Sequence, residues 1–367
     1  MRFIHCADLH LDSKMEANLT REQAKERKEE ILLTYMQMID YAKKNQVRAI
    51  LIAGDLFDTK KVSKRTQNVV YDSIVSNPEI DFLYLRGNHD ASSFLDSLCM
   101  KHGNRELPEN LKLFGETFRH YTYGDIMISG VELSADRMEY VYEGLLLSPE
   151  LYHIVMLHGQ EAKYRGKDTT PKIALSELKN RNIDYLALGH IHTYKEGKLD
   201  RRGIYCYSGC LEGRGFDECG QKGFVVLDIE EKKCTRTFIP MGKRTLHEVF
   251  VDISNSLSTS QVVESMKEAT RHISKQDLVK VVLTGEVELE AELDLSYLTK
   301  LLQEEFYFGK VSNETRLAIH LDQLANDVSL KGEFLRMVLG DKKLTDKEKE
   351  QISLLGVKAL EGEEFGL

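Results

Sequence analysis

Short apolar runs recur along the first two thirds of this chain, and they constrain its fold more than any other feature. Ala49–Ala53, for example, is apolar at every position and leads directly into Gly54 and Asp55. Unbroken apolar runs of this length are typical of strands that are buried on both faces. Segments with helical periodicity alternate with these runs, so the sequence predicts an α/β layered domain.

The helices of this domain are predicted from apolar spacing and from proline. One helix stops before Pro78, and another begins with Pro171. The predicted buried strands are 2–7, 49–53, 81–85, 125–131, 153–157 and 184–188, and the predicted helices are 31–42, 64–76 and 171–181. Two further runs, 203–207 and 223–229, are predicted as antiparallel strands that close the domain.

Pro240-Met241-Gly242 marks the predicted boundary between two domains, 1–240 and 241–367. A chain of 367 residues exceeds one usual domain, and proline and glycine interrupt regular structure. The second domain is predicted to mix α and β elements and to end in a helical segment, 328–360, that is broken near Gly340. Its predicted strands are 245–253, 278–289 and 314–318, and its predicted helices are 259–273 and 293–306.

Composition and chain start predict a cytoplasmic protein without a membrane segment. An apolar fraction of 42% with 30% charged residues suits a soluble chain. No apolar run reaches the about 18 residues that a membrane span requires, and Met1–His5 lacks the shape of a signal peptide. The six cysteines form no CxxC pair, so we expect reduced thiols rather than a zinc ribbon.

The charge distribution argues against tight nonspecific DNA binding by this chain alone. The net charge is −9, with −2 over residues 1–240 and −7 over residues 241–367. DNA-binding proteins usually carry a broad basic surface, and none is visible in this sequence. Part of the acidic excess in the first domain consists of residues of the metal-ligand type, whose charge bound cations would offset.

Seven side chains of the metal-binding kind lie on five short segments, each just after a strand-like run. These segments are Asp8-Leu9-His10, Gly54-Asp55-Leu56-Phe57-Asp58, Gly87-Asn88-His89-Asp90, Leu157-His158-Gly159 and Gly189-His190-Ile191-His192. The carboxyl ends of strands are where sites form in open α/β sheets. Two clustered divalent cations need a bridging carboxylate, neutral imidazoles and an open position for water. We therefore predict a dinuclear metal site.

The five segments together resemble the calcineurin-like metallophosphoesterase superfamily. Carried over by motif, one metal position would be formed by Asp8, His10, Asp55 and His192, and the other by Asp55, Asn88, His158 and His190. The resemblance also implies that Asp55 bridges the two cations. It assigns His89 as the general acid or phosphate-contacting histidine, and Asp58 as the carboxylate that orients this histidine.

Within this superfamily the chain is similar to the SbcD-type DNA repair exonucleases, and most to their YhaO-like branch. The likeness covers residues 1–240 and includes Leu-Gly-His-Ile-His at 188–192 and the segment 207–218. It implies a four-layer sandwich of two mixed sheets flanked by helices, followed by a smaller α+β capping domain. Ser208, where many relatives have proline, and the glycine-rich segment 213–215 depart from the pattern.

The resemblance implies a DNA nuclease in which water activated by two metal ions, typically Mn²⁺, hydrolyses a phosphodiester. Sequence alone predicts only a mixed nitrogen and oxygen site. The resemblance further implies an SMC-like ATPase partner of the SbcC type, and a homodimer through helices near 64–76 and 92–102. Two alternatives stay open, namely a phosphodiesterase or phosphatase for small nucleotides, and a low-activity subunit that positions DNA for the ATPase.

Several features have a structural interpretation beside a functional one. His5 and Cys210 are predicted as packed core residues rather than ligands. Arg214 either binds a substrate phosphate or lies in a surface turn. The basic segment 60–65 either steers DNA or only begins a helix. The apolar stripe of 328–360 either packs on its own domain or docks a partner helix.

Overall fold

The computed structural model describes residues 1–15, 19–58, 62–90, 107–134, 141–162, 171–254, 256, 258–287, 293–317 and 328–360. The chain divides into two compact units, Met1–Leu246 and His247–Leu367. Lys243 and Arg244 belong to the first unit, where both form ion pairs with Glu30. Among the described residues, no helix is long and apolar enough to cross a bilayer.

The first sheet of the first unit is mixed. Its order is β14 (Lys233–Pro240), β13 (Gly223–Glu230), β1 (Arg2–Cys6), β2 (Ala49–Ala53), β3 (Asp81–Leu85) and β4 (Leu111–Leu113). The strands β1 to β4 are parallel to one another, whereas β13 is antiparallel to both β1 and β14. The carboxyl ends of β1, β2 and β3 therefore lie at one edge of this sheet.

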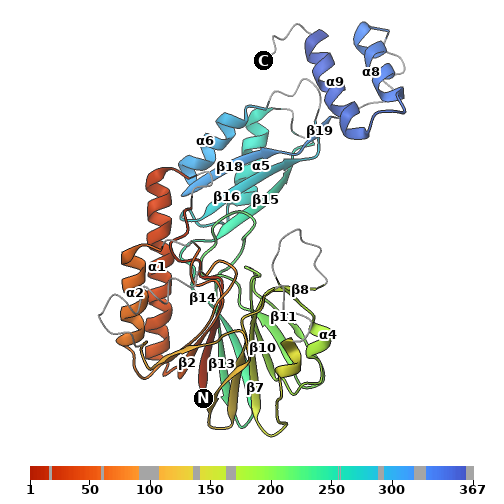
Figure 1. Ribbon diagram of the computed structural model, residues 1–367. Coiled ribbons are helices and arrows are strands. Elements are labelled where there is room, and N and C mark those ends of the chain that lie inside the picture. The colour runs from red at the N-terminus through yellow and green to blue at the C-terminus, as the bar shows by residue number, and fades with distance from the viewer. Residues whose placement is uncertain are drawn as a thin grey trace. The chain divides into compact units, whose positions relative to one another are not determined.

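The second sheet is mixed as well. Its order is β11 (Lys195–Lys198), β12 (Ile204–Tyr207), β10 (Tyr185–Gly189), β7 (Tyr152–His158), β6 (Ile126–Gly130) and β5 (Arg119–Tyr123). The four central strands are parallel, and the two edge strands are antiparallel to their neighbours. Figure 1 shows the two sheets facing each other, with α1 and α2 outside the first sheet.

Both faces of the central strands are buried, which explains their unbroken apolar sequences. In β2, Leu51 packs between the sheets, whereas Ile50 and Ile52 pack toward the helices. In β7, Met156 packs between the sheets, and Leu157 packs on the outer face of the second sheet. The alternation fixes the register of these central strands, because a shift by one residue would exchange the two faces. This arrangement confirms the predicted α/β class with two mixed sheets flanked by helices.

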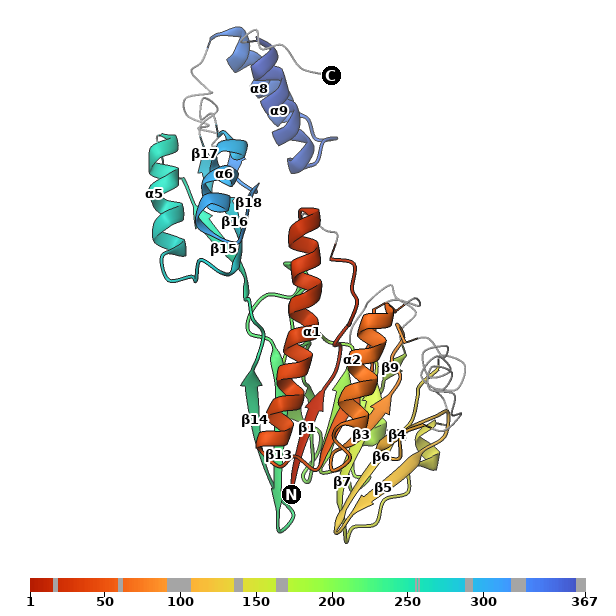
Figure 2. The same ribbon diagram turned by 90° about the vertical axis from the view of Figure 1, so that its left-hand side faces the viewer.

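The helices α1 (Arg21–Lys44) and α2 (Lys64–Val75) lie side by side on the outer face of the first sheet (Figure 2). α1 begins at a capping box, in which the Thr20 side chain accepts from the backbone of Gln23 and Gln23 bonds back to Thr20. It includes the charged residues before Ile31 and is therefore longer than the predicted helix 31–42. Ser63 caps α2, which has the predicted start.

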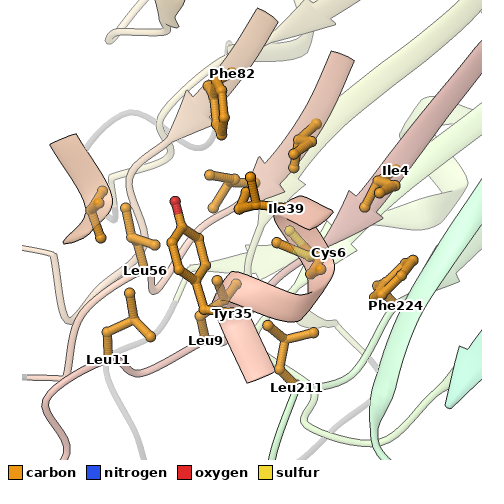
Figure 3. Packing of buried hydrophobic residues seen from close by; sticks show 14 of the residues in the cluster. Ile4, Cys6, Leu9, Leu11, Tyr35, Ile39, Leu56, Phe82, Leu211 and Phe224 are labelled. Carbon is orange, nitrogen blue, oxygen red and sulfur yellow. The ribbon is translucent and has the colours of Figure 1, made fainter. Parts of the chain in front are cut away.

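The core between α1 and the first sheet also holds the loops that follow β1 and β2. Figure 3 shows the ring of Tyr35 from α1 beside Leu9, Leu11 and Leu56. All of these side chains are buried. Burial of side chains this large contributes about 1.5–3 kcal/mol each, so this packing anchors both loops to the core.

One prediction for the first unit is wrong, and another is correct only in part. Residues 171–181 form a short strand, β9 (Lys172–Ile173), and one helical turn, α4 (Leu175–Leu178), in place of one helix. β9 pairs with β8 (Gln160–Glu161), and this pairing holds the backbone extended after Pro171. Residues 204–207 pair antiparallel with β11, as predicted, but they pair parallel with β10. The strands β4, β5, β8, β11 and β14 were not predicted.

The second unit contains a three-stranded sheet, two helices beside it and a helical pair. β16 and β18 are parallel, and the core includes Val281, Leu298 and Met266. Its elements are β15 (Leu246–Asp252), α5 (Thr259–Thr270), β16 (Leu278–Thr284), β17 (Glu286–Val287), α6 (Leu295–Glu305), β18 (Phe308–Asn313), β19 (Arg316–Leu317), α8 (Leu330–Gly340) and α9 (Asp346–Leu360). The predicted break near Gly340 is confirmed, whereas β18 was not predicted.

Candidate metal centre

The predicted ligands follow β1, β2, β3, β7 and β10, whose carboxyl ends converge at one edge of the two sheets. Backbone hydrogen bonds tie the first two segments together. The N–H of Asp8 donates to the carbonyl oxygen of Gly54, and the N–H of His10 donates to that of Asp55, each at 3.0 Å. Segments from distant parts of the sequence are thus brought to one place by strand pairing, as the sheet topology requires.

Alternation of polar and apolar residues orients the first two segments. Asp8 and His10 point to the site, whereas Leu9 and Leu11 enter the core, and Leu56 is also packed there. The backbone adopts the left-handed region at four predicted ligand positions, namely Asp8 (φ 52°), His10 (φ 44°), Asp55 (φ 51°) and His190 (φ 99°). Such conformations cost on the order of 1–3 kcal/mol each and cluster at functional sites.

Glycines allow the strand ends to approach closely. A Cβ on Gly54 (φ 93°) would lie 2.1 Å from Nδ1 of His158, and one on Gly189 would lie 2.0 Å from the carbonyl oxygen of Ala53. A Cβ on Gly87 would lie 2.1 Å from Oδ1 of Asp55. These positions exclude any larger residue while the ligands keep their places.

Asp8, His10 and His192 form the first donor group. Nε2 of His10 lies 3.1 Å from Nε2 of His192, and Nε2 of His192 lies 4.0 Å from Oδ1 of Asp8. Both oxygens of Asp8 accept from the backbone N–H of His190 at 2.9 Å. His10 and Asp8 are buried, whereas the side chain of His192 is 25% exposed.

Asp55, Asn88 and His158 form the second donor group. Nε2 of His158 lies 3.4 Å from Oδ2 of Asp55 and 3.0 Å from Oδ1 of Asn88. The same Oδ2 of Asp55 lies 3.9 Å from Nε2 of His10, so this carboxylate stands between the two groups. The ring of His190 lies edge-on to the ring of His158, with 5.6 Å between the centroids.

This donor set fits a pair of divalent cations. Ligand atoms at about 2.0–2.2 Å from one cation lie about 3–3.6 Å apart, which is close to the spacing observed in both groups. Imidazoles, carboxylates and one amide suit a borderline or hard divalent metal. The first position would be held by Asp8, His10, Asp55 and His192, and the second by Asp55, Asn88, His158 and His190.

The electrostatics of the site favour positive charge. Burial raises the pKa of the Asp8 carboxyl to about 6. Burial, together with the charge of Asp55, also raises the pKa of Asp90 to about 6. The Asp55 carboxylate, 3.4 Å from Nε2 of His158, outweighs burial and raises the pKa of that imidazole to about 9. Burial lowers the pKa of the His10 imidazole to about 4, so this ring is neutral at pH 7 and has a lone pair for a ligand.

His89 and Asp58 lie next to the first donor group. Nδ1 of His89 is 3.9 Å from Oδ1 of Asp58, and the His89 and His10 rings are 5.1 Å apart. The His89 side chain is 45% exposed, whereas its backbone N–H donates to Oδ1 of Asp55 at 2.9 Å. His89 is thus fixed to the site by its backbone and presents its ring at the solvent side.

Arg214 lies at the site and is engaged by carboxylates. Its Nη1 donates to Oδ1 of Asp58 at 2.9 Å, and its Nη2 donates to Oε1 of Glu218 at 2.8 Å. Oε1 of Glu218 lies 2.6 Å from Nδ1 of His192. The carboxylate of Glu218 therefore contacts both the arginine and an imidazole of the first donor group.

Glu218 and Asp90 were missed as site residues by the sequence reasoning. The carboxylate of Asp90 accepts from the backbone N–H groups of Gly87 at 2.9 Å, Phe57 at 3.0 Å and Leu56 at 3.3 Å, which joins the segments after β2 and β3. Asp90 is adjacent to the predicted His89, and this proximity was an available signal. Glu218 lies four residues after the predicted Arg214, but its imidazole partner is 26 residues away.

The interpretations of His5 and Cys210 as core residues are confirmed. His5 is fully buried, and its Nδ1 lies 2.8 Å from the hydroxyl of Tyr185. Cys210 is buried, with burial raising its thiol pKa. The basic segment 60–65 and the predicted helix at 92–102 lie partly or wholly outside the described residues, whose relevant parts are 62–90 and 107–134.

The fold and the donor geometry define a metal-dependent hydrolase of phosphoesters. The family model "Calcineurin-like phosphoesterase" matches residues 1–194, and the chain belongs to this family. The matched range contains both donor groups and His89, and it ends before Arg214 and Glu218.

Curated relatives include proteins with nuclease and repair names. The "Uncharacterized metallophosphoesterase YhaO" of Bacillus subtilis is 28% identical over 78% of this chain and 72% of its own length. The "DNA double-strand break repair protein Mre11" of Sulfolobus acidocaldarius is 22% identical over 82% of this chain and 79% of its own. The D component of the nuclease SbcCD of Staphylococcus epidermidis is 25% identical over 66% of this chain and 70% of its own length. Similarity therefore extends beyond residue 194 in these proteins.

Proposed function

We propose that this protein is a DNA nuclease of the SbcD type, acting in DNA repair, that uses two divalent metal ions. The observation that carries the proposal is the position of Asp55 between two donor groups, at 3.9 Å from His10 and 3.4 Å from His158. When bound, the two cations would neutralise phosphate charge and lower the pKa of an attacking water. The relatives named for nuclease and repair activity support DNA as the substrate.

In this proposal the chain's own residues position the reactants. Asp55 is buried and holds the His89 backbone through a hydrogen bond of 2.9 Å. The exposed ring of His89 would contact the scissile phosphate or protonate the leaving oxygen, and Asp58 would orient that ring. General acid catalysis of this kind contributes about 10²–10⁴-fold to a rate.

The experiment uses the full chain purified in EDTA and reloaded with Mn²⁺, the metal we propose. Single-stranded DNA, a DNA hairpin and bis-p-nitrophenyl phosphate are compared as substrates, with Asp55→Asn as the site variant. Asp228→Asn is the matched control, since Asp228 pairs with Arg2 outside the site. Cleavage of DNA that needs Mn²⁺ and Asp55 supports the proposal. Turnover of the small diester with intact DNA would favour the small-nucleotide alternative.

We also propose that the helical pair α8 and α9 binds an SMC-like ATPase. Phe334 packs closely over Gly356, where an added Cβ would lie 2.0 Å from its ring. Apolar side chains nevertheless remain exposed, including Leu330 (68%), Met337 (72%) and Leu355 (55%). A co-purification with an SbcC-type ATPase, with and without residues 328–367, tests this. Equal recovery of the ATPase would remove the segment from consideration.

A homodimer through α2 is a further proposal, which stems from the family resemblance. Val75 at the end of α2 is 47% exposed. Leu33 and Met36 of the adjacent α1 are also exposed, at 49% and 44%. Light scattering of the wild type and of Val75→Glu measures the mass. A monomeric wild type at micromolar concentration would contradict this proposal. It would leave the proposed nuclease activity unaffected.

A further inference from the structure

The two imidazoles of the first donor group are each backed by a carboxylate on the side away from the metal position. Nδ1 of His192 lies 2.6 Å from Oε1 of Glu218, and Nδ1 of His10 lies 3.1 Å from Oδ1 of Asp58. The Nε2 atoms of both rings face each other at 3.1 Å. A carboxylate behind a ligand histidine fixes the ring and its tautomer.

One guanidinium joins these two carboxylates. Arg214 donates through Nη1 to Asp58 at 2.9 Å and through Nη2 to Glu218 at 2.8 Å. Its backbone N–H also donates to Oε2 of Glu218 at 2.8 Å. These contacts connect His10 to His192 through Asp58, Arg214 and Glu218, and the link from His10 to Asp58 is an ion-pair distance without hydrogen-bond geometry.

The segment that carries Arg214 is itself held in the core. Arg27 of α1 is fully buried, and it donates to the carbonyl oxygen of Gly213 at 2.8 Å and to Glu212 at 3.1 Å. Thr34 donates to the other oxygen of Glu212 at 2.7 Å. Because these polar groups are buried and paired, moving the segment would leave buried charges unpaired, which is strongly destabilising.

We propose that Arg214 is a positioning residue for one metal position only, and that it fixes the orientations of His10 and His192 by holding Asp58 and Glu218. This inference rests on the proposed metal centre and adds an asymmetry to it. The second donor group has a separate support, because Nδ1 of His158 lies 2.9 Å from the carbonyl oxygen of Ala53. Loss of Arg214 therefore weakens the first position and spares the second.

The sign of the effect separates positioning from simple charge. A cation beside a metal position repels the metal, so removing Arg214 would raise metal affinity if charge alone mattered. Loss of orientation instead lowers affinity, typically by 10–100-fold for groups behind a ligand. A substrate-binding arginine would leave metal affinity unchanged and would raise KM for DNA.

The experiment isolates each position in a background that removes the other. Asn88→Ala leaves the first position, and His192→Ala leaves the second. Mn²⁺ binding is followed by the electron paramagnetic resonance of the free ion, with Arg214→Gln absent or present. We expect Arg214→Gln to weaken binding 10–100-fold in the Asn88→Ala background and less than about twofold in the His192→Ala background. Arg236→Gln is the control, because Arg236 lies on β14 and forms its ion pair with Glu196 of β11, away from both donor groups.

Two further variants distinguish a loss of side-chain orientation from misfolding of the protein. Arg214→Lys keeps the charge, but a single ammonium lacks the fork that reaches both carboxylates, so we expect no rescue of binding. Glu218→Gln tests the same contacts from the other side and should also weaken the first position. Unchanged or tighter Mn²⁺ binding in folded Arg214→Gln and Glu218→Gln overturns the inference. A wild type that binds no Mn²⁺ would instead overturn the metal centre itself.

Discussion

Nε2 of His10 and Nε2 of His192 face each other at 3.1 Å, although 182 residues separate them in the sequence. Each ring has a carboxylate behind it, on the side of its Nδ1 atom. Two imidazoles so arranged are oriented toward a shared electrophile, and a divalent cation satisfies both lone pairs at once. Because only the folded chain brings these two rings together, metal binding should stabilise the folded state.

Metal binding should stabilise the first unit. Each cation that binds only the folded chain adds about 2.7 kcal/mol to the unfolding free energy at a concentration of 100 times its Kd. We expect His192→Ala to lose one such contribution, as measured by urea denaturation with Mn²⁺ and with EDTA. His120→Ala is the control, because His120 bonds to Ser129 on β5 and β6 away from the site. Equal Mn²⁺ stabilisation of wild type and His192→Ala would contradict the ligand assignment.

Replacement of His89 should separate catalysis from metal binding. Neither donor group includes the His89 ring, so His89→Asn should retain both cations by elemental analysis. Its kcat on DNA should fall by about 10²–10⁴-fold, the usual contribution of a positioned acid or base. His247→Asn, which changes a histidine paired with Asp277 in the second unit, should leave kcat unchanged. Full activity of a metal-loaded His89→Asn would remove His89 from the mechanism.

Gly54 should be sensitive to a single added methyl group. Its Cβ would lie 2.1 Å from Nδ1 of His158, so Gly54→Ala must displace a ligand. Gly220 is a matched control, because its φ of 86° is close to the 93° of Gly54 and nothing lies within 4 Å of its Cβ among the described residues. Both substitutions share a backbone cost of about 1–2 kcal/mol.

The clash at Gly54 should add about 1–3 kcal/mol of destabilisation beyond that shared cost. Only Gly54→Ala should lose Mn²⁺ at the second position, as seen by the same denaturation and binding measurements. Similar Mn²⁺ binding by Gly54→Ala and Gly220→Ala would mean that the close approach of Gly54 to His158 has no part in holding the ligand.

Local patterns predicted the strands that carry the site, because burial on both faces leaves an unbroken apolar run. Ala49–Ala53 and Asp81–Leu85 form strands with the predicted bounds. The direction in which two strands pair leaves no local sequence pattern, so the parallel pairing of β12 with β10 was not predicted. Residues 171–181 show the same limit, since pairing with Gln160–Glu161 overrides helical spacing there.

The donor segments could be picked out of the sequence because five short motifs occur together, each just after a strand-like run. Among the supporting residues, Asp58 was assigned from the family resemblance, whereas the role of Glu218 exists only after folding. Glu218 gains its role from His192 and Arg214, and the strand β12 stands between the donor segment and this carboxylate in the sequence. The exposure of His89 likewise follows from its place in the site and not from its neighbours.

The pH dependence of stability should include a contribution from His5. Burial lowers the pKa of the His5 imidazole from 6.5 to about 3. The unfolded chain therefore binds a proton that the folded chain does not, so stability is complete above pH 6.5 and falls as the pH drops below that value. The slope approaches about 1.4 kcal/mol per pH unit for one such group.

The raised pKa of Asp8 and of Asp90 acts in the opposite direction between pH 6 and 4, so a difference between variants is the required measurement. His5→Leu combined with Tyr185→Phe removes the titrating ring and its hydroxyl partner together. Between pH 7 and pH 5 in EDTA, the wild type should lose about 2 kcal/mol more than this double variant by urea denaturation. Tyr185→Phe alone keeps the imidazole and should keep the wild-type slope. Parallel pH profiles for the wild type and the double variant would show that His5 does not titrate differently on folding.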